Sequence, residues 1–240
     1  MIEHPNDAAS SSPISRFFRE RSNALATVIV VSLIISLSQG AISYSVLLGA
    51  LRDRFNISDR LLASLQWLVR GGLLILAGVL WMLKRKRVLF RVIIIANVFF
   101  TAILLSDVAF LLSLLSGSTS RAAATLLVDV AMVATSNILI FSIWYWIIDP
   151  PGVIEGEEAH EPWAFLFPQR STLLPHYESW KPHYMDYLFI AFMTSFAFSP
   201  TDTLPLTRTA KMLMMVQSAI SVVTLTGIAG AAINILAGHN

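Results

Sequence analysis

The stretch MDYLFIAFMTSFAFSPTDTLPLTR, residues 185–208, decides the fold of this chain, together with the apolar run that follows it at residues 212–237. An apolar helix of about 13 residues rises only about 20 Å, which is too short to cross ~30 Å of hydrocarbon. It ends in the polar, proline-containing segment Ser199-Pro200-Thr201-Asp202-Thr203. Because non-helical backbone cannot face lipid, such a break must line a wet cavity or be buried in protein. The stretch therefore predicts a re-entrant half-helix before a final transmembrane helix.

The composition of the whole chain predicts a membrane environment. Hydrophobic residues make up 55% and charged residues 13% of the 240 positions, whereas charged residues are roughly 25% of soluble domains. The apolar residues come in runs longer than ~18, which is the membrane pattern. The absence of cysteine excludes disulfides, thiolate catalysis and cysteine-ligated metals. A net charge of +2 does not favour nucleic acid as a partner, so the expected partner is the lipid bilayer.

The chain divides into four regions along the sequence. These are a disordered cytosolic arm (1–23), a four-helix transmembrane region (24–151), an interfacial loop (152–185), and a pore-loop-like half-helix with the final transmembrane helix (186–240). Within the second region, helices are expected over about 24–51, 61–83, 88–115 and 122–148, and Asp149-Pro150-Pro151 ends the fourth because proline cannot continue a helix. The predicted fold class is all-α, a polytopic membrane bundle of five transmembrane helices plus one re-entrant half-helix before the last.

The distribution of basic residues predicts the orientation in the membrane. With the N-terminus in the cytoplasm, that side holds seven Lys and Arg residues, three in the arm and four at 84–87, against four on the opposite side (Arg52, Arg54, Arg60 and Arg121). The positive-inside rule then predicts a multi-pass protein of the cell inner membrane with a cytoplasmic N-terminus. The aromatic residues Trp144, Tyr145 and Trp146, which close the fourth helix, are expected at the membrane interface.

Three ionisable residues fall inside predicted spans, namely Arg70, Asp107 and Asp129. Counted from the helix ends, they lie roughly 11–14 Å from the same membrane face at ~1.5 Å per residue. A shared depth suggests that they pair, since a lone charge in the membrane is costly. This cluster is either a relay or coupling site for protons or cations, or a structural ion pair that fixes helix order. Asn97, Asn137 and Asn234 are expected to make interhelical hydrogen bonds.

The half-helix and its break supply the pore-loop candidates Thr194, Ser199, Thr201, Asp202 and Thr203. Residues 194–205 resemble the pore segment of the two-helix potassium-channel module, where a pore helix leads into Thr-x-Thr-Thr-Val-Gly-Tyr-Gly-Asp-x-x-Pro. Thr194, Asp202 and Pro205 match its first threonine, aspartate and proline, whereas residues 197–201 replace its filter. The filter is degenerate because its glycines are missing, and glycine supplies the backbone geometry that potassium selectivity requires.

A broader resemblance is to a family of uncharacterised bacterial five-helix inner-membrane proteins of similar length. Its members share an arginine-rich link after the second helix and a C-terminal pattern matched here by Asp186-Tyr187, Ala191-Phe192, Phe198, Thr201-Asp202-Thr203 and residues 234–238. This resemblance implies a fold and no established activity.

Two functions stay open from the sequence. One is an oligomeric ion channel or transport protein with a non-standard pore loop, which needs several chains, four if they form a pore, and which attracts a monovalent cation to Asp202. The other is a non-transporting membrane scaffold or assembly partner. In that case Asp202 or Thr201 only caps a short helical link that Pro205 opens. No catalytic motif, cofactor site or metal site is predicted.

Overall fold

In the computed structural model, the described residues are 22–41, 59–83, 85–116, 123–149, 163–171, 180–196, 202–230, 233 and 237. Most of the described residues are helical. The elements are α2 (Ser22–Ala41), α4 (Asp59–Met82), α5 (Lys86–Ser116), α6 (Ala123–Ile148), β1 (Phe165–Leu166), α7 (Pro168–Ser171), α8 (Tyr184–Phe196), β2 (Leu204–Pro205), α9 (Arg208–Val222) and the π-helix η1 (Val223–Ile228).

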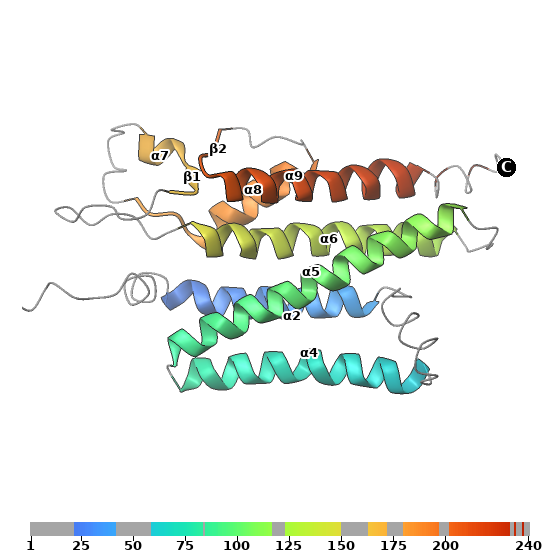
Figure 1. The fold of residues 1–240 in the computed structure, drawn as a ribbon, viewed down its shortest axis with the longest axis horizontal. Coiled ribbons are helices and arrows are strands. Elements are labelled where there is room, and N and C mark those ends of the chain that lie inside the picture. Colours follow the sequence, from blue (N-terminus) through green and yellow to red (C-terminus); the bar gives the residue numbers. More distant parts are fainter. Residues whose placement is uncertain are drawn as a thin grey trace, which may run out of the picture.

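The long helices run side by side along the long axis of the molecule, and α5 crosses the bundle obliquely (Figure 1). Helix α4 lies at one side of the bundle and α9 at the other, while α6 lies between them and packs against α2, α5, α8 and α9. The central position of α6 explains why it is the most apolar of the long helices and why its side chains from Ile140 to Trp146 are mostly buried.

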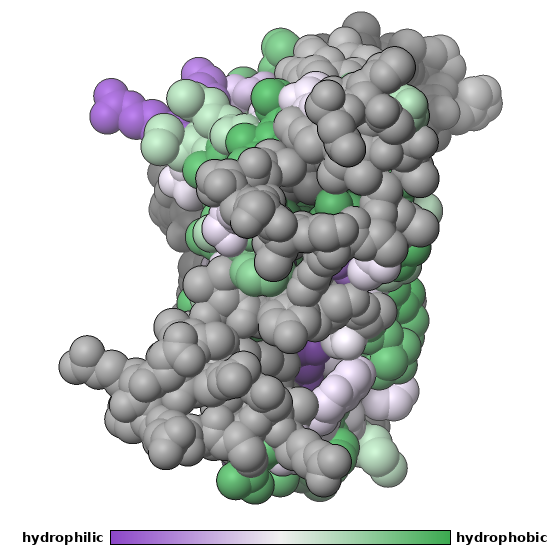
Figure 2. All heavy atoms as spheres, turned by 90° about the vertical axis from the view of Figure 1, so that its right-hand side faces the viewer, coloured by the Kyte–Doolittle hydropathy of each residue, from purple (hydrophilic) through white to green (hydrophobic). Residues whose placement is uncertain are grey.

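Three helices are long and apolar enough to cross a membrane, over Arg87–Ser113, Thr125–Ile148 and Arg208–Thr226. Shorter apolar stretches cover Leu25–Gly40 in α2 and Trp67–Met82 in α4. Large hydrophobic side chains are exposed on all of these helices, among them Leu33, Leu68, Ile95, Val128 and Met215. Figure 2, which looks along the bundle, shows hydrophobic residues on its flanks where described residues reach the surface.

The bounds of three observed helices agree closely with the prediction. Helices α4, α5 and α6 correspond to the expected ranges 61–83, 88–115 and 122–148. Helix α2 already begins at Ser22, inside the predicted arm, and residues 42–51 of the first predicted helix lie outside the described residues. Helix α9 begins at Arg208, four residues before the predicted start, and continues into the π-helix η1. The Thr224 hydroxyl donates to the Ile220 carbonyl (2.7 Å) where this wider turn begins.

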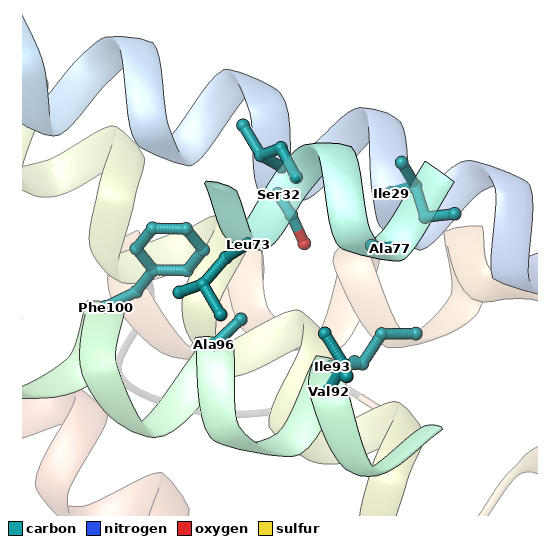
Figure 3. A pocket seen from close by; sticks show the side chains of 9 residues that line it. Ile29, Ser32, Leu73, Ala77, Val92, Ile93, Ala96 and Phe100 are labelled. Carbon is teal, nitrogen blue, oxygen red and sulfur yellow. The ribbon is translucent and has the colours of Figure 1, made fainter. Parts of the chain in front are cut away.

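The contact between α2, α4 and α5 contains a small cavity of about 10 Å³. Its lining side chains point toward one another from the three helices (Figure 3), and they are apolar apart from Ser32. The Ser32 hydroxyl already donates to the Val28 carbonyl (2.8 Å), so a trapped water would lack the two to four polar partners that it needs. This cavity is therefore a packing void and not a ligand site.

Candidate functional site

Helix α8 is held between α6 and α9 by hydrogen bonds at both of its ends. At its start, the Tyr184 hydroxyl lies 2.5 Å from the Ser142 hydroxyl of α6, and the Tyr187 hydroxyl donates to Asp149 (2.6 Å). Near its other end, Ser195 accepts a hydrogen bond from Gln217 of α9 (2.8 Å). Gln217 is nine residues beyond the start of α9, so α8 ends about halfway along its neighbour.

Gln217 is the hub of the contact between these three helices, and its side chain is fully buried. Its amide nitrogen Nε2 donates to the Ala191 carbonyl (2.8 Å) and to the Ser195 hydroxyl (2.8 Å), both on α8. Its oxygen Oε1 accepts a hydrogen bond from the Tyr145 hydroxyl of α6. One side chain on α9 therefore fixes the depth of α8 and its rotation against α6.

We expect Gln217→Leu to lower the stability of the protein by about 2 kcal/mol, because three buried hydrogen bonds are lost. Interhelical hydrogen bonds in membranes average ~0.6 kcal/mol each, with a maximum of ~1.7 kcal/mol. The measurement is the thermal unfolding midpoint in detergent. Met215→Leu is the matched control, since Met215 lies on the same helix with its side chain 65% exposed. Equal midpoints for the two variants would show that the hub does not hold α8.

Asp149 anchors the end of α6 to two other segments, and its side chain is fully buried. Its oxygen Oδ1 accepts from the backbone N–H groups of Ala164 (2.9 Å) and Phe165 (3.3 Å). Its oxygen Oδ2 accepts from Arg170 Nη1 (3.2 Å) and from the Tyr187 hydroxyl (2.6 Å). The Arg170 guanidinium also lies over the rings of Trp163 and Phe167. One carboxylate thus ties the segment 163–171 and the start of α8 to the end of α6.

After α8 the chain returns to the end of the bundle at which α8 began. Strand β2 pairs antiparallel with β1, with Phe165 opposite Pro205, and the Leu206 N–H donates to the Ala164 carbonyl (2.8 Å). Since Ala164 is bonded to Asp149, β2 lies at the Asp149 end, and α9 starts there (Figure 1). Residues 197–201, which join α8 to this segment, lie outside the described residues.

The N-cap of the last helix is a different residue from the two candidates, Asp202 and Thr201, that the sequence offered. Helix α9 starts at Arg208, and Thr207 is its N-cap, with its hydroxyl accepting from the Ala210 N–H (3.2 Å). Pro205 lies in β2 and does not open a helix. The expectation that Asp202 or Thr201 caps a helical link opened by Pro205 is therefore wrong, because the pairing with β1 keeps this segment extended until Thr207.

The predicted pore-loop residues do not gather at one described place. Thr194 is buried in α8, beside the Tyr145 hydroxyl. Thr203 is buried and donates a long hydrogen bond (3.4 Å) to Asp202, whose side chain is exposed two residues before β2. Ser199 and Thr201 lie outside the described residues. Asp202 therefore precedes by two residues the strand β2, which lies at the Asp149 end of the bundle.

The predicted charge cluster is buried, with Arg70, Asp107 and Asp129 each 1% exposed on α4, α5 and α6. Arg70 interacts electrostatically with Asp107 and donates from Nη1 to the Ser36 carbonyl of α2 (3.3 Å). Its guanidinium also lies 5.7 Å from the centre of the Trp67 ring. The structure therefore brings Arg70 and Asp107 together.

Gly40 permits α2 to lie close to the Trp67 and Arg70 side chains of α4. A Cβ atom at Gly40 would lie 2.5 Å from the Trp67 ring and 3.2 Å from Arg70 Nη1. A larger residue at this position would require the Trp67 ring to move, because a contact of 2.5 Å is far inside van der Waals distance. No pattern in the sequence marks Gly40, because its role depends on contacts with another helix.

Two of the three predicted interhelical asparagines act as expected. Asn97 of α5 donates to the Ile140 carbonyl of α6 (3.3 Å), and Asn137 of α6 donates to the Ser221 hydroxyl of α9 (2.9 Å). Asn234 lies outside the described residues. These bonds confirm the prediction for Asn97 and Asn137, and they extend the polar contact around Gln217 toward the middle of α6.

The described part of the chain contains no group of three His, Cys, Asp or Glu residues placed to hold a metal ion. Comparison of the chain with protein-family models, with curated proteins and with solved structures found no match.

Proposed function

We propose that this chain is an integral membrane protein with five spanning helices in which α8 is a re-entrant half-helix. The 13 residues of α8 rise about 20 Å, well short of the ~30 Å hydrocarbon core. The proposal is supported by the position of Ser195 halfway along α9 and by the return of the chain to β1 at the Asp149 end.

The Asp149 end of the bundle faces the cytoplasm in this proposal. The exposed basic residues Arg85, Arg87 and Arg91 follow the turn between α4 and α5 at this end, and Arg208 and Lys211 begin α9 there (Figure 1). Arg85 and Arg87 are among the basic residues counted from the sequence, and the addition of Arg91, Arg208 and Lys211 strengthens the asymmetry that sets orientation. The start of α2 lies at the same end (Figure 1), which supports a cytoplasmic N-terminus for a protein of the cell inner membrane.

Within the membrane we propose that the protein is an oligomeric channel or transport protein that passes monovalent cations. The observation that carries this function is the half-helix α8, which ends about halfway along α9 and is followed by an extended segment back at the Asp149 end. Membrane proteins use re-entrant elements of this kind to line a path for ions or substrates. One such loop per chain requires several chains around an axis. The resemblance of residues 194–205 to the potassium-channel pore segment supports the same proposal.

The experiment is cation flux into liposomes containing the purified protein, combined with its mass in detergent. We expect an oligomer with a flux that Asp202→Asn reduces, because the exposed carboxylate attracts cations. Asp186→Asn is the matched control, since Asp186 already accepts a hydrogen bond from the His183 N–H (2.6 Å) at the start of α8. A monomer without flux, or equal flux in both variants, would contradict the channel proposal.

A second candidate function is a non-transporting scaffold or assembly partner, and it is favoured by the two faces of α8. Its polar side chains Tyr184, Tyr187 and Ser195 form hydrogen bonds to α6, Asp149 and α9, inside the chain. Its exposed residues Met185, Phe189, Phe192 and Phe196 form an apolar stripe. A flux-free protein that keeps these bonds and copurifies with a membrane partner through the stripe would support this candidate.

A further inference from the structure

One face of α5 carries an apolar stripe that begins at two arginines. Arg87 and Arg91 are exposed in the first two turns of the helix. The stripe continues through Ile95, Val98, Leu105 and Leu112, whose side chains are between 42% and 61% exposed. Spacings of three, four and seven residues keep these side chains on one side of a helix. The result is a continuous surface about 25 residues long. Among its described residues, the positive charges lie at one end.

The charged end of this stripe coincides with the basic end of the bundle. Arg87 and Arg91 follow the turn between α4 and α5, which lies at the same end as β1 and β2 (Figure 1). At the other end of the stripe, the last six residues of α5 (111–116) are all leucine or serine. The α5 stripe therefore has the polarity of a phospholipid, with a place for an anionic headgroup followed by a place for an acyl chain.

We propose that the α5 stripe binds an acidic phospholipid of the cytoplasmic leaflet. The guanidinium groups of Arg87 and Arg91 hold the phosphate, because arginine presents N–H groups in a fork that matches phosphate oxygens. The acyl chain covers Ile95, Val98 and the residues beyond them. This inference rests on the membrane-spanning part of the proposed function and is independent of ion conduction. A zwitterionic lipid lacks the net charge that the two arginines select.

The test measures lipid affinity of the whole protein in a neutral detergent by native mass spectrometry, with phosphatidylglycerol, phosphatidylcholine and inorganic phosphate as probes. We expect phosphatidylglycerol to bind more tightly than phosphatidylcholine and inorganic phosphate not to bind. Arg91→Gln should weaken phosphatidylglycerol binding about fivefold and Arg87→Gln/Arg91→Gln about 25-fold, since each cation near an anionic surface contributes ~1 kcal/mol and 1.4 kcal/mol is a tenfold change.

The matched control is Arg60→Gln, which removes the same charge from the first turn of α4 at the opposite end of the bundle. Its phosphatidylglycerol affinity should equal that of the unchanged protein. Equal affinity for the two lipids, an equal loss in Arg60→Gln, or binding of inorganic phosphate with the affinity of the lipid would overturn the inference. If the unchanged protein shows no flux but prefers phosphatidylglycerol, the channel proposal alone is contradicted. If it shows flux but binds the two lipids equally, the proposal for the α5 stripe alone is contradicted.

Discussion

Replacing Asp149 with alanine is expected to cost about 3–5 kcal/mol of stability, the range for removing one partner of a buried ion pair. The change removes the Asp149 acceptor from the Ala164 and Phe165 N–H groups and from the Tyr187 hydroxyl. It also removes one of the two acceptors of Arg170 Nη1, which still donates to the Phe165 carbonyl (3.1 Å). The Arg170 side chain is only 6% exposed, so water cannot easily replace the lost carboxylate. The measurement is the thermal unfolding midpoint in detergent.

The control for this variant is Asp186→Ala, at the same end of the bundle. Asp186 accepts one hydrogen bond, from the His183 N–H at the start of α8, and loss of a helix-capping interaction costs about 1 kcal/mol. The Asp149 variant should therefore unfold at a clearly lower temperature than the control. If the two midpoints were the same, the carboxylate of Asp149 would not be the anchor that joins α6, α8 and the segment 163–171.

Replacing Arg70 with leucine has the second large effect that we expect, about 3 kcal/mol, because a buried hydrogen-bonded cation is lost together with its favourable electrostatic interaction with Asp107. The change also removes the hydrogen bond to the Ser36 carbonyl and the contact with the Trp67 ring. Unfolding midpoints in detergent measure the effect, and they should be taken in the same buffer for all variants.

A double-mutant cycle separates pairing from simple loss of packing. The variant Arg70→Leu/Asp107→Leu removes both charges, and apolar replacement of a whole buried pair is often neutral or stabilising. We expect the double variant to be more stable than Arg70→Leu alone. Additive losses from the two single changes would instead show that Arg70 and Asp107 do not stabilise each other, and the structural ion pair would be disproved.

The sequence predicted the elements of the bundle well because their signals are local. Long apolar runs, a basic turn at 84–87 and the prolines after Asp149 mark the bounds of α4, α5 and α6. The burial of Arg70, Asp107 and Asp129 also followed from their position within those runs. The number of spanning helices and the re-entrant path of α8 stay predictions, since three helices are long and apolar enough to cross a membrane.

The residues that fix α8 could not be predicted, because their roles depend on contacts between distant segments. Gln217 is one glutamine in a methionine-rich stretch, and it becomes a hub only when α8 and Tyr145 pack around it. Tyr145 and Trp146 were expected at the interface, yet both are buried, since the segment around Phe165 and helix α8 cover the end of α6. Asp149 was interpreted only as the end of a helix, whereas it holds three segments together.

The central claim is that the chain enters the membrane at α8 and returns to the same side before α9. The chain has no cysteine, so single cysteines can be placed at His183, which is exposed just before α8, and at Arg208, which is exposed at the start of α9. Thr226, exposed near the other end of the last helix, marks the opposite side. A membrane-impermeant maleimide should label positions 183 and 208 from one face of sealed vesicles and position 226 from the other. Labelling of positions 183 and 208 from opposite faces would contradict the claim.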